Sequence, residues 1–164
     1  MYRPRIIVFM LTCLCILGAA APRARAQAVE IDDINVDKER TPEYKVANQP
    51  RGGRTREWLV IEVEYETEPE WIDEMEVVYY VVLKADKRRG NDSPYKLLRG
   101  RVTYVNIEEG DHLSRVYLHP STMARFGDPE RVAVLVQYQG RLVAMASNPR
   151  SNTRWWEQLT PVDG

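Results

Sequence analysis

The side chains best suited to chemistry at neutral pH in this sequence are His112 and His119. Histidine is the natural general acid or base, because its charge changes near neutral pH. The two residues lie seven apart in a segment with strand character, and an odd offset sends them to opposite faces of a strand. They therefore cannot share a metal ion, and no serine lies in a Gly-x-Ser-x-Gly motif. The sequence predicts no enzyme, no catalytic residue, no cofactor and no metal site.

The carboxylates are spaced as a strand surface and not as an active site. In residues 57–68, Glu62, Glu64 and Glu66 alternate with apolar residues, which is typical of a strand with one face in water. Carboxylate pairs on such a face carry no weight as a glycosidase site without a cleft to hold a sugar. The acidic turn at 108–111 is too compact for a calcium loop, which spreads its ligands over about a dozen residues.

Four tryptophans are the remaining candidates for recognition, because indoles are enriched at interfaces and one end of the ring system is polar. Trp155 and Trp156 are adjacent in the C-terminal stretch "RWWEQL". Two adjacent residues in a short tail cannot both face one surface. We therefore expect one of them to anchor the tail near Trp58 and the other to stay accessible. Together with Trp71, these residues form the candidate interaction surface.

Seven short segments must position these side chains. Residues 75–86 are almost continuously apolar, which is typical of a central strand packed on both faces. Gln139 and Gly140 predict a tight hairpin, and Ser121 or Thr122 as a cap with Gly127 as a stop predicts a short helical turn near 120–127. The segments with strand character are 29–36, 57–68, 75–86, 96–107, 112–119, 131–138 and 141–147.

This pattern predicts an all-β single domain with one short helical turn. The first choice is an antiparallel immunoglobulin-like β-sandwich of about seven strands, and a small β-barrel is the alternative. Within the central segment, Tyr79 and Tyr80 must face opposite ways. Val81 lies among apolar neighbours, so we expect it to be buried.

Residues 1–26 have the composition of a secretory signal peptide. Two arginines precede an apolar run of 16 residues at 6–21, and small residues follow it. The run is shorter than the roughly 20 residues that span a bilayer, so no transmembrane segment is expected after processing. Cleavage after Ala26 or Ala28 leaves one domain, residues 27–164, exported to the periplasm, the cell surface or the medium.

The leader also distorts the composition of the chain. It contains both cysteines, Cys13 and Cys15, so the mature protein has no disulfide. The chain holds 23 basic and 24 acidic residues, and removal of the leader's four arginines leaves 19 basic residues and a net charge of −5. A mildly acidic exported chain without a clustered basic face excludes nucleic acid as a partner.

Intact mass spectrometry of the exported protein tests the leader. We expect a mass that begins at Gln27 or Val29, because the basic start, the apolar run and the small residues match processing by signal peptidase. A mass that includes residues 1–26 in the envelope fraction would contradict both the processing and the net charge of −5.

Several strings together resemble a known family. They are "WLVIEVEYETEPEWIDEMEVVYYVVLK", "LLRGRVTYVNIEEG", "VYLHPSTMARFG" and "RWWEQL". They are similar to small secreted immunoglobulin-like proteins of Verrucomicrobia-type bacteria, including the genus Akkermansia, in which a member is described as pilus-like. The similarity runs from about Val29 to Leu159. It implies a sandwich without enzymatic activity near type IV pilus or other surface machinery, and it assigns no catalytic residue.

Two functions from different classes remain open. The first is a non-enzymatic structural or protein-interaction module that contacts an envelope or surface protein through an edge strand or through its aromatic side chains. The second is a carbohydrate-binding module that holds mucin or another glycan by stacking exposed aromatic rings on sugars.

Overall fold

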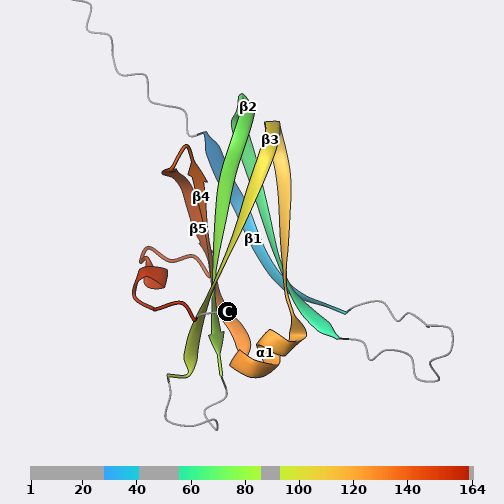
Figure 1. The fold of residues 1–164 in the computed structure, drawn as a ribbon, viewed down its shortest axis with the longest axis vertical. Helices are drawn as coiled ribbons and strands as arrows, with labels where there is room; N and C mark the ends of the chain where they lie inside the picture. The colour runs from blue at the N-terminus through green and yellow to red at the C-terminus, as the bar shows by residue number, and fades with distance from the viewer. Residues whose placement is uncertain (1–27, 41–55, 86–92, 163–164) are drawn as a thin grey trace, which may run out of the picture.

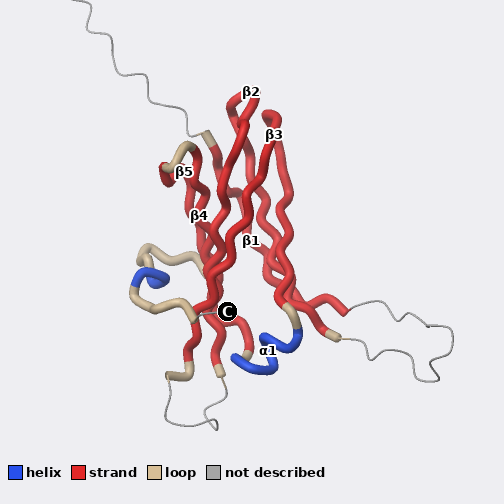
Figure 2. Tube along the Cα trace, viewed as in Figure 1, coloured by secondary structure: helices blue, strands red, loops and turns tan. Residues whose placement is uncertain are grey.

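The computed structural model describes residues 28–40, 56–85 and 93–162, so the leader at 1–26 lies outside it. The described chain is almost entirely strand, with one helix and one 3-10 turn (Figure 2). The elements are β1 (Val29–Arg40), β2 (Glu57–Lys84), β3 (Tyr95–Leu118), α1 (Pro120–Phe126), β4 (Asp128–Tyr138), β5 (Arg141–Asn148) and η1 (Trp155–Glu157).

β2 and β3 form one long antiparallel hairpin that folds back on itself. Residues 59–67 pair with 110–118, and residues 71–84 pair with 95–108. The register shifts once, between these two stretches. There both strands reach one end of the molecule and return toward the other (Figure 1).

A hydrogen bond within β3 shows how sharply the hairpin folds. The hydroxyl groups of Tyr104 and Ser114 are hydrogen-bonded, although ten residues separate them in one strand. Ten residues of straight strand would place them roughly 33 Å apart. The Tyr79 hydroxyl reaches the same serine at 2.6 Å. The two halves of each strand therefore face one another across the interior.

The fold-back arranges one continuous sheet in two layers. One layer contains β1, the first half of β2 and the second half of β3. The other contains β5, β4, the second half of β2 and the first half of β3. The edges of β1 and β5 approach each other, and Asn148 Nδ2 donates to the Ile34 carbonyl at 2.6 Å. No ladder joins these two edges in the described chain, so the sheet is a curled half-barrel.

The predicted all-β antiparallel fold with a short helical turn is confirmed. The seven predicted segments correspond to five strands, because β2 and β3 each contain two of the segments, one on either side of the bend. The immunoglobulin-like detail differs: a sandwich of that type has two separate sheets, whereas every described strand here belongs to one sheet.

The main hydrophobic core fills the space between the layers. Alternate residues of β2 point into it from both halves of the strand, and β4 adds Val132, Val134 and Val136. Tyr79 lies in this core and Tyr80 on the opposite face, as predicted. The buried residues that β2 contributes are Leu59, Ile61, Val63, Tyr65, Ile72, Met75, Val77, Tyr79, Val81 and Leu83.

Helix α1 closes one end of the core with Met123 and Phe126, which pack against it. Its N-terminal cap is His119, whose Nδ1 accepts a hydrogen bond from the Ser121 amide at 3.1 Å. The prediction of Ser121 or Thr122 as the cap was therefore wrong by two or three positions. Gly127 ends the helix as predicted, with φ 103°.

Substitution of Gly127 by alanine is expected to destabilise the domain by about 2 kcal/mol or more. A β-carbon there would lie 2.0 Å from the Lys84 carbonyl oxygen, and φ 103° is unfavourable for any other residue. Gly140→Ala is the matched control, because φ is also positive there but no atom lies within 4 Å. Urea denaturation compares the two, and equal losses would show that the close approach to Lys84 is not what requires glycine.

Candidate interaction surface

The C-terminal tail crosses the outer face of the layer that contains β4 and is held there by Trp155 and Trp156. Both indoles are buried, with only 5% and 6% of their surface exposed. The prediction that one of them stays accessible was therefore wrong. The two rings pack edge to face at 5.4 Å between centroids, so each covers part of the other as well as the sheet.

The surface beneath the tail is an apolar strip on the outer side of the sheet. Trp156 stacks on Tyr80, with 6.3 Å between ring centroids. The strip exists because β2 is apolar on both faces, so its outward residues need a cover. The remaining residues in contact are Val82, Leu97, Ala133, Leu135 and Leu159.

The tail is therefore not near Trp58, as the sequence analysis expected. Trp58 lies at the start of β2, in the other layer, and packs edge to face on His119 at 4.8 Å between ring centroids. The two rings lie beside the N-terminus of α1 because His119 caps that helix. The candidate tryptophans consequently occupy three separate places and do not form one surface.

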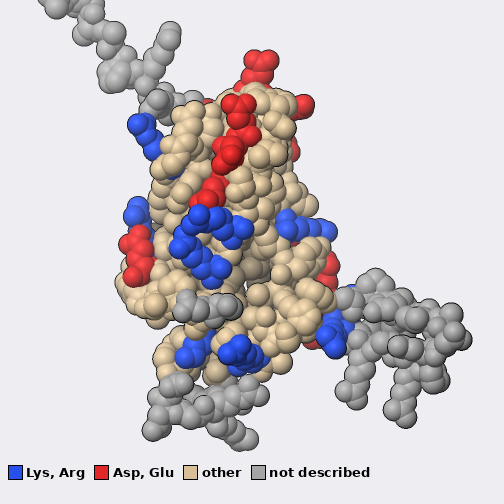
Figure 3. Space-filling view, viewed as in Figure 1, with Lys and Arg blue, Asp and Glu red and all other residues tan. Residues whose placement is uncertain are grey.

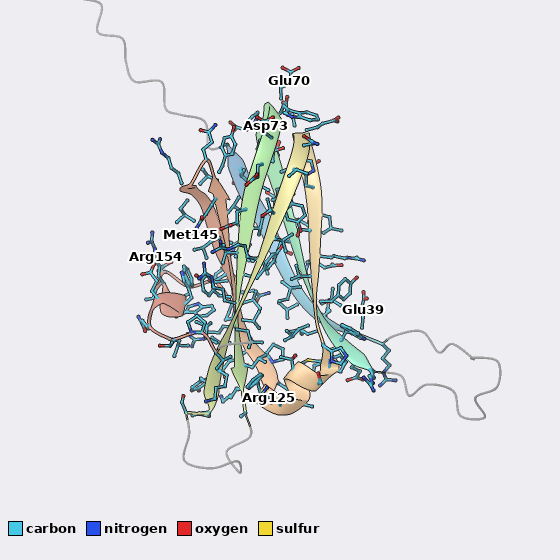
Figure 4. All side chains as sticks on the ribbon, in the orientation of Figure 1. Glu39, Glu70, Asp73, Arg125, Met145 and Arg154 are labelled. Atoms are coloured by element: carbon cyan, nitrogen blue, oxygen red, sulfur yellow. The ribbon has the colours of Figure 1, made fainter. Side chains whose placement is uncertain are left out.

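Trp71 is the most exposed of the four, with 47% of its surface accessible. It lies at the bend of β2, opposite Glu108 of β3. Its neighbours in sequence, Glu70 and Asp73, project at the end of the molecule remote from Arg125 of α1 (Figure 4). The Trp71 indole therefore lies among carboxylates at this end of the molecule. Ligand binding by Trp71 remains a prediction.

The two histidines have structural partners, and only His112 lies in β3, which ends at Leu118. His112 Nε2 is 2.9 Å from the Glu108 carbonyl oxygen and 3.1 Å from Thr67 Oγ1. Its ring stacks on Tyr65. His119 lies just after β3 and caps α1. The described residues contain no group of three potential metal-ligating His, Cys, Asp or Glu side chains.

The buried phenols are held in their neutral form. Burial raises the pKa of Tyr65 to about 12. Burial also raises the pKa of Tyr79 well above its usual range, partly offset by the hydrogen bond from Ser114. Groups this far from neutral pH do not exchange protons with a substrate. Tyr79 instead links the two layers through its hydrogen bond with Ser114, and Tyr65 packs against the His112 ring.

A groove of about 520 Å³ lies between the edges of β1 and β5. It is lined by Ile31, Asp33, Met145, Asn148 and Arg150, among others. Asn148 spans it through its bond to the Ile34 carbonyl. The groove therefore separates two sheet edges that are joined by this hydrogen bond.

The outer edge of β3 is a feature that the sequence analysis did not single out. The tail touches it at one point, where Pro161 bridges Leu97 and the Val162 amide donates to the Leu97 carbonyl at 2.9 Å. Beyond that point, no other described strand pairs with this edge. Exposed Arg99, Arg101 and Thr103 follow along it. The alternation in "LRGRVT" was the only sequence signal for it.

The chain was compared with known proteins. One protein-family model matches residues 20–163, which is most of the chain. A crystal structure of a protein from Akkermansia muciniphila is similar, with a TM-score of 0.66, 24% identity, and coverage of 81% of this chain and 77% of that one. None of the curated proteins compared with the sequence matches it.

Two sugar-cleaving enzymes show a weaker and partial likeness. A GH3 β-glucosidase from Bifidobacterium adolescentis gives a TM-score of 0.35 at 18% identity, over 73% of this chain and 16% of the enzyme. A β-D-glucoside glucohydrolase from Trichoderma reesei gives 0.35 at 9% identity, over 73% and 18%. Such low scores give no support for glycosidase activity here.

Proposed function

The chain belongs to the family whose model spans residues 20–163, and from this premise we propose that it is a non-enzymatic, exported structural or protein-interaction module. Its place is the cell envelope or surface, in association with type IV pilus or other surface machinery. The resemblance of its strand and aromatic strings to secreted pilus-associated proteins supports that place. No described helix has the length and apolar character needed to cross a membrane.

The observation that carries the proposal is the unpaired outer edge of β3. Several described side chains with titratable groups are engaged within the domain: His119 caps α1, Tyr79 is hydrogen-bonded across the core, and Lys84 pairs with Glu130 at 3.1 Å. An exposed edge strand, in contrast, offers unmatched amide and carbonyl groups to another chain. At the edge of β3, a partner would therefore be bound mainly through backbone amide and carbonyl groups.

The carbohydrate-binding alternative loses its strongest support from the burial of Trp155 and Trp156, because a buried ring cannot stack on a sugar. Trp71 remains as a single exposed indole. A glycan platform usually combines an aromatic surface with convergent polar groups in a concave site. We therefore place protein binding first.

Pull-down from the native envelope tests this function. The bait is tagged protein comprising residues 27–164, and bound proteins are identified by mass spectrometry. We expect an envelope or pilus-assembly subunit that the unfolded Val81→Asp variant does not retain. Retention of the bait on a mucin column, lost in Trp71→Ala, together with no envelope protein, would instead support the glycan alternative and contradict the proposal.

A further inference from the structure

We propose that the outer edge of β3, from Arg99 to Thr103, is the docking site for an extended segment of a partner protein in which acidic and apolar residues alternate. This inference rests on the proposed function and specifies its surface and the chemistry of its partner. The segment would add to the sheet as a further strand.

Apart from β3, whose second half also pairs only with β2, the sheet has two edges, β1 and β5, and both are protected against such addition. β1 carries a bulge between Ile31 and Asp33, and its Ile34 carbonyl already accepts from Asn148. β5 lies opposite it across the groove, and its pairing with β4 also contains a register shift. Bulges, and coverage of one edge by a neighbouring segment, are two means by which proteins prevent another strand from pairing with a sheet edge.

The edge of β3 lacks these protections. Its register with β2 is regular from Tyr95 to Ile107. The Leu97 carbonyl points away from β2, since it accepts from Val162 of the tail. Backbone groups alternate between the two sides of a strand in an antiparallel ladder, so the amides and carbonyls of Arg99, Arg101 and Thr103 also point outward. The tail shows that an extended segment can bond to this edge.

The side chains along the edge select the partner. Arg99 and Arg101 are exposed on the outer face. Arg101 pairs with Glu76 at 3.1 Å, whereas Arg99 lies over the Tyr80 ring and no described ion pair includes it, so Arg99 carries the unpaired positive charge. Basic side chains gather in the middle of this face, below a column of acidic ones (Figure 3). On the inner side, Leu98 and Val102 are only partly buried against the core. An added strand therefore meets positive charge on one face and apolar surface on the other, which favours acidic and apolar residues in alternation.

The edge of β3 also differs in charge from the edge of β1. β1, the other long edge, carries Glu30, Asp32, Asp33 and Asp37, and the mature protein is acidic. An acidic segment is repelled there and attracted at Arg99. Charge complementarity of this kind sets the choice of partner more than the strength of binding.

The test uses a soluble peptide of alternating glutamate and valine with blocked ends, and its lysine counterpart. Binding to residues 27–164 is measured by fluorescence anisotropy. Thr103→Pro removes an outward amide and places a ring on the edge, a position where strands tolerate proline. Thr103→Val is the matched control, because it keeps the amide and the strand preference.

We expect the glutamate peptide to bind wild type and Thr103→Val alike, with at least about tenfold weaker binding to Thr103→Pro and to Arg99→Glu. Arg99→Glu should prefer the lysine peptide, and this reversal serves as the test if Thr103→Pro fails to fold. No binding of the glutamate peptide, or equal binding to all variants, would overturn the proposal. Self-association that Thr103→Pro abolishes would also overturn it, because the occupant would then be a second copy.

The envelope pull-down separates this inference from the proposed function. If Thr103→Pro and wild type retain the same envelope proteins, the interaction module stands and the assignment of its edge is wrong. If neither retains any, the proposed function fails as well.

Discussion

Replacement of Val81 by aspartate is expected to unfold the domain at room temperature. Val81 is 5% exposed and points into the main core from the second half of β2, between β3 and β4. An unpaired buried charge costs about 3 kcal/mol or more, which is a large part of the 5–15 kcal/mol typical of a domain. Protonation of the aspartate would avoid the charge but leave a polar group without partners.

Val105→Asp is the matched control for this substitution. Val105 lies on β3 with 61% of its surface exposed, so its variant should remain within about 0.5 kcal/mol of wild type. Thermal melts followed by circular dichroism compare the two. A Val81→Asp protein that melts within a few degrees of wild type would show that β2 is not the central strand.

Alanine at Trp155 and alanine at Trp156 should each cost about 3–5 kcal/mol, since each removes a large buried aromatic side chain. The two effects should not add, because the rings contact each other. Trp156→Phe should cost less than alanine. It keeps most of the ring and removes an indole N–H that finds no acceptor among the described residues.

Trp71→Ala provides the comparison for an exposed indole and should cost about 1 kcal/mol or less. Urea denaturation of the variants measures the differences. If one of the two tail variants were as stable as wild type, the tail would be held by a single indole and the other would be available for binding.

Features encoded locally were predictable from the sequence. The alternation in 57–66 fixes which side chains enter the core, and Tyr79 and Tyr80 separate onto two faces for the same reason. Gln139 and Gly140 adopt φ 51° and 71°, as a tight hairpin requires. Each depends on a few neighbouring residues and on the period of a strand.

The bend of the long hairpin was not predictable in the same way. Pro69 between two glutamates reads as a turn that separates two strands, but β2 continues through it and only the register shifts. Whether a chain ends a strand or bends it depends on the partner strand. β3 bends at the same level, where Gly110 has φ 124°.

The burial of both tail indoles was implied by the sequence but not recognised. An apolar segment at 75–86 indicates packing on both faces, so a second cover had to exist. The inner face is covered by the other layer of the sheet, and only the tail remains for the outer face. The edge of β3 could not be found from the sequence, because pairing partners distant in the chain decide which edges stay open.

Residue-level amide hydrogen exchange of the free protein by NMR tests the open edge most directly. The amides of Gly100 and Val102, which face β2, should exchange slowly, while those of Arg99, Arg101 and Thr103 should exchange rapidly because they face water. This alternation should be absent from the second half of β2, which is paired on both sides. Uniform slow exchange from Arg99 to Thr103 would show that the edge is already paired in the free protein and would contradict the account.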